Sequence, residues 1–510
     1  MTQPRLGDMN DSEIGSGIIG QTIFAKEHDM TGIETSKLGM GTAALESNAV
    51  AELQEAVRGP VLTPDSHGYD EVRQVWNKLI DRRPELIVRA TGTADVVTAV
   101  NFAREHQLLL AVHGGGHGVA GNATCDGGLM LDLSLMKGIR VDSRERSAHA
   151  QGGVTWGDLD HETQLYGLAT PGGVVSTTGI SGLTLGGGYG HLRRKYGLSC
   201  DNLLSVEVVT ADGQVLTASE SEHADLFWAV RGGGGNFGVV TSFEYRLHAV
   251  GPLVTYLSTM YPFEALSEVI PAWRDLMARA IPELSCNCLC WTVPDDPDFP
   301  LEARGRDVVT VMGVHCGPLE EGMAFVDPLR NLAEPISDST AQLPYARVQT
   351  LFDWAFPAGE HYHYWKSLYI NEINEDVIGI FREVFAIRPA KSILFDLWAM
   401  GGAVNAVATE ESAIGDRSAP YTLVFNTTWY DPSLSEACID WTRQFYTRLQ
   451  PYSPGGSYLN FAGLLQEKGL VERAYGRNYP RLAAIKAKYD PGNLFRLNQN
   501  IEPAEWEPAH

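Results

Sequence analysis

The sequence lacks the features that mark secreted, membrane-spanning and nucleic-acid-binding proteins. None of its 510 residues fall in a run of about 18 or more uncharged apolar residues, so no transmembrane helix is expected. The first residues, MTQPRLGDMNDSEIG, show no basic segment followed by an apolar one. With 39 basic and 63 acidic residues, the net charge of −24 disfavours nucleic acid or an anionic membrane as a partner. We therefore expect a cytoplasmic protein with neither kind of partner.

Cysteine is also scarce, and its distribution does not indicate disulfide bonds. The chain has seven cysteines, an odd number in a long sequence without a secretion signal. Cys286, Cys288 and Cys290 alternate in CNCLC, which places them on one face of a strand. Their spacing fits no standard zinc finger, so we interpret them as small apolar residues of a half-buried strand rather than as a metal site.

The common nucleotide-binding motifs are missing, but two glycine-rich loops are present. The sequence contains no G-x-x-x-x-G-K-[ST], and no G-x-G-x-x-G follows the first strand of a βαβ unit. One loop runs from His113 to Gly121 as HGGGHGVAG, and the other, from Pro171 to Gly190, holds eight glycines. Consecutive glycines let backbone N–H groups approach phosphate or carbonyl oxygens closely.

The first loop by itself is compatible with three interpretations. It can cradle a large flat cofactor, or it can be a plain turn whose histidines are surface groups or satisfied hydrogen bonders. His113 and His117 also have the spacing of two metal ligands on a helix, although three intervening glycines disfavour a helix there. Two such loops within about 80 residues of each other indicate an extended ligand.

The pattern of apolar residues predicts an α+β fold with two main domains, because 510 residues exceed the usual span of one core. Residues 1–55 form an N-terminal extension with a possible short helix at 51–58. Strands such as 86–90 and 129–134 alternate with a helix at 94–107 in a first domain, 56–250. In a second domain, 251–455, alternating segments such as 253–261, 284–293 and 421–430 predict an antiparallel sheet covered by helices, one of them at 434–449. Residues 456–510 return to the first domain, where Leu494, Phe495, Leu497 and Ile501 pack on its body.

Longer motifs make a family resemblance specific. YGLATPGGVVSTTGISGLTLGGGYGHLRRKYGLSCDNL at 166–203, VVTADG at 208–213 and DLFWAVRGGGGNFGVVTSFEYRL at 225–247 occur in one order. In this respect the chain resembles, from Gly59 to Ile501, the berberine-bridge-enzyme-like branch of the vanillyl-alcohol-oxidase type flavoproteins. The resemblance implies a two-part PCMH-type FAD-binding domain and a substrate domain whose antiparallel sheet covers the flavin ring.

The resemblance also implies an activity. It is that of an FAD-linked oxidase, which transfers hydride from a small alcohol, sugar or heterocyclic amine to covalently bound flavin, with molecular oxygen as acceptor and H2O2 as product. Two alternatives stay open, namely a dehydrogenase that uses another acceptor and a flavin-binding protein without turnover. No metal site is predicted.

In the family's R-x-G-G-H motif, the final histidine bonds the flavin 8α carbon, and His117 holds that position here. His113 replaces the usual arginine, and its role is open. Val175 replaces the cysteine that many relatives join to flavin C6, so we expect attachment through His117 alone. Thr178 matches a position that controls oxygen access in relatives. The residues expected to contact FAD are His113, Gly114, Gly115, Gly116, His117, Gly118, Gly121, Asn122, Pro171, Gly172, Gly173, Thr178, Gly179, Gly182, Leu185, Gly186, Gly188, Asp201, Asn202, Gly238, Val239, Val240, Asn460, Asn498 and Asn500.

Tyr458 matches the first tyrosine of the family's Y-x-N-[YF] motif, which implies a catalytic base. A phenol with an ordinary pKa near about 10 needs help to act as a base at neutral pH, and Lys366 is the expected positive charge. The alternatives are a core tyrosine and a structural lysine. Phe425, Thr427 and Trp429 share a strand face that lines either the substrate pocket or the core. Because Met400 and Asp416 replace a tyrosine and a histidine of the family's motifs, we do not expect a second catalytic tyrosine.

Overall fold

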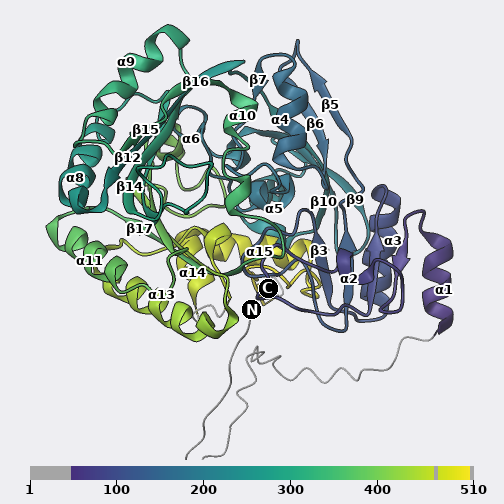
Figure 1. Ribbon diagram of the computed structural model, residues 1–510. Coiled ribbons are helices and arrows are strands. Elements are labelled where there is room, and N and C mark those ends of the chain that lie inside the picture. The colour runs from purple at the N-terminus through teal and green to yellow at the C-terminus, as the bar shows by residue number, and fades with distance from the viewer. Residues whose placement is uncertain (1–46, 465–468, 506–510) are drawn as a thin grey trace, which may run out of the picture. The chain divides into compact units, whose positions relative to one another are not determined.

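A computed structural model describes residues 47–464 and 469–505, which all belong to one compact unit, Ala43–His510 (Figure 1). Residues 1–46 of the predicted extension lie outside the described residues. The helix expected at 51–58 is present as α1, Ser47–Ala56. Across 47–464 and 469–505, no helix is both long and apolar enough to cross a membrane.

The first part of residues 56–250, the domain expected to bind FAD, is a four-stranded sheet. Strands β2 (Leu86–Arg89), β4 (Leu129–Asp132) and β3 (Leu110–His113) are parallel, and β1 (Val61–Leu62) pairs with β2 in the antiparallel sense. Helices α2 (Tyr69–Val72) and α3 (Thr93–Glu105) belong to this part, and α3 buries Val96, Ala99 and Val100 in its core. Strand β3 ends at His113 and leads directly into the first glycine loop.

The second part is a five-stranded antiparallel sheet to which the C-terminal segment returns. The strand order is β5 (Ile139–Asp142), β6 (Ser147–Gln151), β10 (Val239–Arg246), β8 (Leu203–Val209) and β9 (Val215–Ser219). The other elements are α4 (Trp156–Gln164), β7 (Leu168–Ala169), α5 (Ile180–Leu185), α6 (Arg193–Tyr196), α7 (Ala224–Val230), β11 (His248–Ala249), α14 (Leu470–Tyr475) and α15 (Tyr479–Tyr489). Ile501 and Leu482 lie in the same core as Val206, so the C-terminal residues pack on this part.

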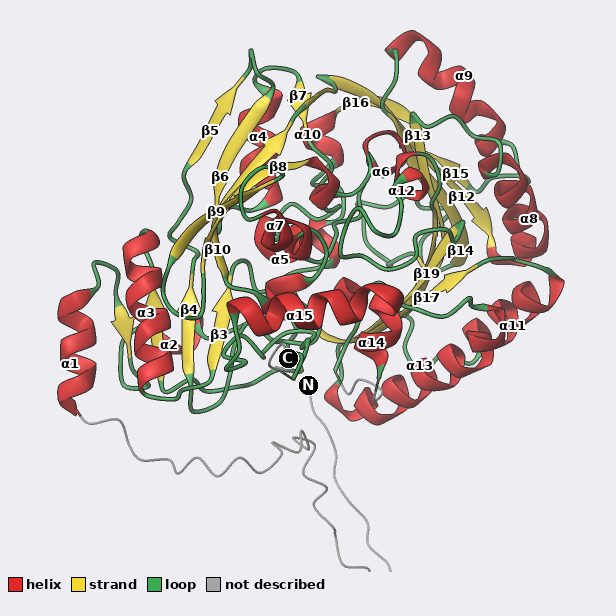
Figure 2. Cartoon of the chain, turned by 180° about the vertical axis from the view of Figure 1, so that it is seen from behind, coloured by secondary structure: helices red, strands yellow, loops and turns green. Residues whose placement is uncertain are grey.

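Residues 251–455, the expected second domain, contain the predicted antiparallel sheet, and the α+β fold class is confirmed. Eight strands run in the order β15 (Ser337–Asp338), β12 (Leu253–Pro262), β14 (Asp307–His315), β13 (Leu284–Thr292), β18 (Leu394–Ala399), β19 (Tyr421–Trp429) and β17 (Tyr362–Ile370), with β16 (Ala341–Pro344) also on β12. Along one face lie α8 (Leu266–Met277), α9 (Leu319–Arg330), α11 (Glu375–Ala386) and α13 (Ser435–Leu449), as Figure 2 shows. Short helices α10 (Tyr345–Val348) and α12 (Ala403–Ala406) follow strands of this region.

The two faces of this sheet differ, and the difference corrects one prediction. Phe425 and Trp429 are 0% exposed in the core beneath the helices, and Thr427 Oγ1 lies 2.6 Å from Thr442 Oγ1 of α13. This face is therefore core and does not line a substrate pocket. Both possibilities were open because a strand with apolar residues on one face does not show what covers that face. The three alternating cysteines of β13, predicted as apolar core residues, lie in the same core.

Candidate active site

A cavity of about 270 Å³ lies where the two glycine loops meet. The loops touch backbone to backbone: a Cβ at Gly115 would lie 2.5 Å from the nitrogen of Gly179, and one at Gly179 would lie 2.7 Å from the nitrogen of Gly115. Real Cβ atoms do not approach so closely, so this contact requires glycine on both sides. Two segments far apart in the sequence thus form one wall.

Most of the residues predicted to contact FAD line this cavity. They are Gly114, Gly115, Gly116, His117, Gly118, Asn122, Thr178, Gly179, Gly182, Leu185, Gly186, Gly238, Val239, Val240, Asn460 and Asn498. Sequence reasoning missed Gly234 and Gly235 of the RGGGGNFG motif, although their signal was the same as that of the first two loops. It also missed apolar residues such as Leu459, Tyr475 and Phe495, which no local pattern distinguishes from core.

The other predicted contact residues are not among those that line the cavity: His113, Gly121, Pro171, Gly172, Gly173, Gly188, Asp201, Asn202 and Asn500. Several have structural partners instead. Gly172 packs on the Trp156 ring, and Gly173 accepts a hydrogen bond from Gln349 Nε2 at 3.0 Å. Asn202 Nδ2 donates to the carbonyls of Tyr196 and Leu198 at 2.9 and 2.8 Å.

The cavity suits a large cofactor with polar edges. A Cβ at Gly118, Gly182 or Gly235 would meet no atom within 4 Å, so any larger residue there would extend into open space. Asn498 Oδ1, in the cavity wall, is buried and has no hydrogen-bond partner among residues 47–464 and 469–505. Buried amide oxygens are rarely left unpaired, and a ligand that donates N–H groups would satisfy them.

His117 lies in this wall with its imidazole held on three sides. Nε2 is 2.9 Å from Thr177 Oγ1, and Nδ1 is 3.4 Å from Thr178 Oγ1. The Trp76 ring stacks on it, with 5.5 Å between centroids and 18° between planes. Burial, followed by the charge of His113, lowers the pKa of His117 to about 4. The imidazole is therefore neutral at pH 7 and free to act as a nucleophile.

His113 packs against the first glycine loop. Its ring lies under the turn at Gly116, where φ is +67° and a Cβ would come within 2.7 Å of the ring. Burial lowers the pKa of His113, so this ring is also neutral, and only Asp132 opposes that shift by charge. His113 thus packs against the glycine turn at Gly116 and is not among the residues that line the cavity.

Tyr458 is buried, and its hydroxyl oxygen faces three donors. The N–H groups of Gly188 and Tyr189 donate to it at 2.8 and 3.2 Å, and Asn460 Nδ2 donates at 2.8 Å. Burial raises the pKa of Tyr458, with the nearby Tyr189 adding to the effect, while the three donors lower it. The net effect is a pKa above the ordinary value, so Tyr458 is protonated at neutral pH, and the three donors would stabilise its oxygen once a proton has left.

A second buried tyrosine, which sequence reasoning missed, stacks on Tyr458. The Tyr189 ring lies 3.8 Å from the Tyr458 ring with 5° between planes, and its hydroxyl is 3.4 Å from that of Tyr369. Burial raises the pKa of Tyr189, and the positive charges of Arg417 and Arg193 oppose the shift. The position of Tyr189 inside GGGYG was the only available signal.

The structure does not bring Lys366 to the Tyr458 hydroxyl. Lys366 Nζ lies 4.3 Å from the centre of the Tyr446 ring of α13, on the helix-covered face of the sheet. The next residue, Ser367, points the other way, and its Oγ accepts from the backbone N–H of Tyr458 at 3.1 Å. The predicted lysine–phenol pair is therefore corrected, because neighbouring strand residues point to opposite faces.

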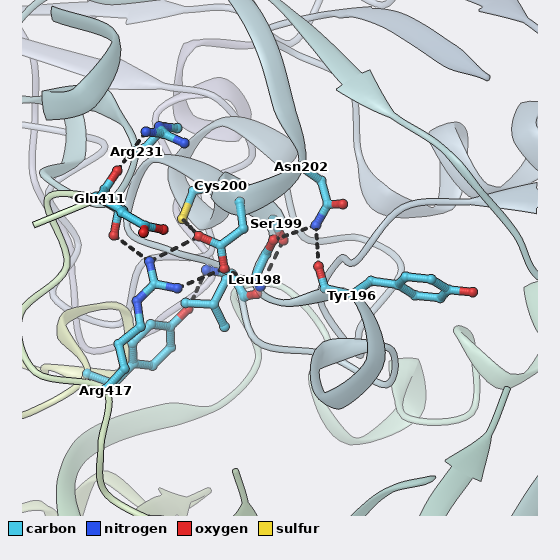
Figure 3. A network of polar contacts seen from close by, with 12 residues as sticks. Tyr196, Leu198, Ser199, Cys200, Asn202, Arg231, Glu411 and Arg417 are labelled. Carbon is cyan, nitrogen blue, oxygen red and sulfur yellow. Dashed lines mark hydrogen bonds and ion pairs between the residues drawn. The ribbon is translucent and has the colours of Figure 1, made fainter. Parts of the chain in front are cut away.

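An ion pair anchors the turn that carries these donors. Arg417 contacts both carboxylate oxygens of Asp201 at 2.8 and 3.0 Å, and Asp201 also accepts from the N–H of Leu198 at 2.8 Å. Figure 3 shows the network of polar contacts around Arg417, Leu198 and Asn202. The N–H of Ser199 in turn donates to the carbonyl of Gly188 at 3.1 Å. Asp201 thus orients the Gly188 turn rather than the cavity wall.

Comparison with known proteins agrees with this architecture. Residues 84–219 match the family described as FAD binding domain, and residues 457–502 match that described as berberine and berberine like. An FAD-linked oxidoreductase of Dictyostelium discoideum is 35% identical over 462 residues, which are 89% of this chain and 97% of the relative.

Two solved structures show the same fold. The 6-hydroxy-D-nicotine oxidase from Arthrobacter nicotinovorans has a TM-score of 0.78 at 30% identity, with 88% of this chain and 98% of that chain covered. The carbohydrate oxidase from Microdochium nivale has a TM-score of 0.77 at 25% identity, with 90% of this chain and 100% of that chain covered.

The fold and the glycine-lined cavity thus define an FAD-dependent oxidoreductase that acts on a small molecule and passes electrons to an acceptor. More particularly, the chain belongs to the berberine-bridge-enzyme-like family of FAD-linked oxidoreductases. The resemblance inferred from the motifs is confirmed.

Proposed function

We propose that this enzyme is an oxidase that takes hydride from a carbon of a small alcohol, sugar or heterocyclic amine and passes the electrons to molecular oxygen, giving H2O2. The observation that carries the proposal is the cavity whose wall holds a neutral His117 and whose edge residue Asn460 bonds the hydroxyl of Tyr458. Two proteins of the same fold are named as oxidases, one of a hydroxynicotine and one of carbohydrates. When bound, FAD supplies the two-electron acceptor.

The proposed attachment of FAD is through His117 alone. A neutral imidazole keeps a lone pair that would bond the 8α carbon, and the low pKa of His117 provides it at neutral pH. The 8α methyl group and the imidazole would each lose one hydrogen, and molecular oxygen would take up the two electrons and two protons as H2O2. The described residues that line the cavity include no cysteine. Val175 stands in the second loop where a thiol would be needed for a second bond.

In the proposed reaction, Tyr458 takes a proton from the substrate hydroxyl or amine while the adjacent carbon loses hydride. The step requires Tyr458 as a phenolate, so its own proton must first leave to solvent against the burial that raises its pKa; the three donors around its oxygen would stabilise that phenolate in place of the positive charge expected from Lys366. Molecular oxygen then takes up the two electrons and two protons and becomes H2O2, so atoms and electrons balance.

Two measurements test the proposal on the holoenzyme. Acid precipitation should leave flavin on the wild-type protein and release it from His117→Ala, and the flavin peptide should contain His117. A panel of alcohols, sugars and cyclic amines is then mixed with wild type without oxygen, and bleaching of the flavin is followed before air is admitted. Bleaching by at least one compound and peroxide on reoxidation are expected. A flavin adduct on a cysteine would contradict attachment through His117 alone. Rapid reoxidation only by acceptors other than oxygen would contradict the oxidase activity.

A further inference from the structure

The segment between β16 and β17, in the expected second domain, contacts the second glycine loop. It contains α10 and the short helix η4 (Asp353–Ala355), and α10 packs beside α4 (Figure 2). Gln349 Nε2 donates to the carbonyl of Gly173 at 3.0 Å. Four residues later, Asp353 Oδ1 accepts from the N–H of Ser176 at 2.8 Å, and Oδ2 accepts from its hydroxyl at 2.6 Å. Two side chains of one segment therefore hold two points of the loop.

Ser176 is the more firmly held of these two points. Its N–H and its hydroxyl both bond one carboxylate, and hydrogen bonds to a charged acceptor are shorter and stronger than neutral ones. Its carbonyl accepts from the N–H of Gly157 of α4 at 2.8 Å. Because Asp353 and Gly157 bond Ser176 from two regions of the chain, the backbone at this residue has little freedom.

The next two residues carry the hydroxyls that contact His117. Thr177 Oγ1 lies 2.9 Å from Nε2, and Thr178 Oγ1 lies 3.4 Å from Nδ1. The Thr177 side chain is exposed, so the place of its hydroxyl depends on the backbone that carries it, which Ser176 fixes. A neutral imidazole has one N–H and one lone pair, and a hydroxyl that donates to one nitrogen leaves the proton on the other. The anchor at Ser176 therefore acts on the tautomer of His117 through one intervening residue.

We propose that Asp353 is a positioning residue for the attachment of FAD: by holding Ser176 it places the Thr177 hydroxyl at His117 Nε2 and so determines which imidazole nitrogen carries the lone pair that bonds the 8α carbon. This inference rests on the proposed attachment through His117 and adds a residue of 251–455 that controls it. The stoichiometry is unchanged, since the imidazole and the 8α methyl group still lose one hydrogen each and molecular oxygen takes up the two electrons and two protons.

The test uses full-length apoproteins of wild type, Asp353→Ala, Asp353→Asn and the matched control Asp142→Ala. Asp142, at the end of β5, also accepts from two donors, the N–H groups of Arg144 and Glu145 at 3.0 Å, but lies outside both glycine loops. Acid-resistant flavin is followed against time at several FAD concentrations, which separates the saturating rate from the half-saturating concentration. Urea unfolding of each protein is measured in parallel.

The position of the proton on His117 is measured without flavin. In apoprotein that contains isotopically labelled histidine, the NMR signals of the imidazole carbons distinguish the two neutral tautomers. His117→Ala identifies which of the signals belong to His117. This readout does not depend on attachment, and loss of stability alone would not select one tautomer.

We expect Asp353→Ala to lower the saturating rate of attachment at least about tenfold, with the half-saturating FAD concentration within about twofold of wild type. Asp353→Asn should lose less, because its amide oxygen still accepts from the N–H of Ser176. Asp142→Ala should behave as wild type. The His117 signals should shift in Asp353→Ala and stay unchanged in Asp142→Ala.

A wild-type saturating rate in Asp353→Ala overturns the inference. A fall in that rate which is matched by weaker FAD binding and lower stability overturns it too, because that pattern would show a structural role alone. If His117→Ala keeps acid-resistant flavin, the proposed attachment fails, and unchanged His117 signals in Asp353→Ala then overturn this inference separately.

Discussion

The two faces of the eight-stranded sheet are formed by the same strands but differ in composition and in what packs against them. Beneath the helices, Phe395, Leu423 and Phe425 belong to a continuous apolar core. On the opposite face, Asp396 and Asn426 are buried polar residues. Because side chains alternate along a strand, neighbouring residues point to opposite faces of the sheet. We therefore expect substitutions on the helix-covered face to change the free energy of unfolding, and substitutions on the other face to change flavin reduction.

Removing a ring from the helix face should have the largest effect. Phe395→Ala should lower the free energy of unfolding by about 3–5 kcal/mol, since Phe395 is 0% exposed and contacts Phe381 and Phe445. Urea unfolding checks this. Phe395→Leu is the control and should lose less of the free energy of unfolding. If Phe395→Ala slowed flavin reduction without lowering stability, the contrast between the two faces would be wrong.

On the opposite side, Tyr458→Phe should slow anaerobic flavin reduction by about 100-fold or more, which corresponds to about 2.7 kcal/mol of activation free energy. The reason is loss of the oxygen that three donors surround. Stopped-flow absorbance measures the rate. Tyr261→Phe, which removes a buried hydroxyl bonded to the Leu329 carbonyl in the helix-side core, should change stability and leave the rate near wild type.

Trp76→Ala should slow covalent attachment of FAD by about tenfold or more, because the ring that stacks on His117 also stacks on His363 of β17 at 3.8 Å. Acid-resistant flavin is measured against time after adding FAD to apoprotein. Trp354→Ala, at a ring 52% exposed, is the control and should behave as wild type. Equal rates for both variants would remove Trp76 as a positioning residue.

The smallest effect is expected at Lys366. Lys366→Met should leave flavin reduction within about twofold of wild type and cost about 0.5–1 kcal/mol of stability through the lost contact with the Tyr446 ring. Ser367→Ala, one residue away on the other face, should disturb activity more because Ser367 supports the backbone of Tyr458. A large loss of activity in Lys366→Met would restore the predicted lysine–phenol pair.

Local sequence patterns predicted the structure correctly where it depends on a single segment of the chain. Alternation predicted the antiparallel sheet, and Cys286, Cys288 and Cys290 proved to be apolar core residues. Alternation did not show which face of β19 meets the helices, so Phe425 and Trp429 were open to two interpretations. For Asp201 and Asn202, the motif placed them near the cofactor, but their partners, Arg417 and the Tyr196 carbonyl, come from the fold.

By itself, the sequence indicated the class of cofactor and the proposed tether, because its glycine-rich motifs and His117 resemble those of a flavoprotein family. Only the tertiary structure decided the surroundings of Tyr458, the contact of His113 with the Gly116 turn, and the burial of Asp396 on the sheet face opposite the helices. These depend on contacts between segments far apart in the chain, such as Gly188 with Tyr458, and on which face of a strand another element covers. No local pattern encodes either.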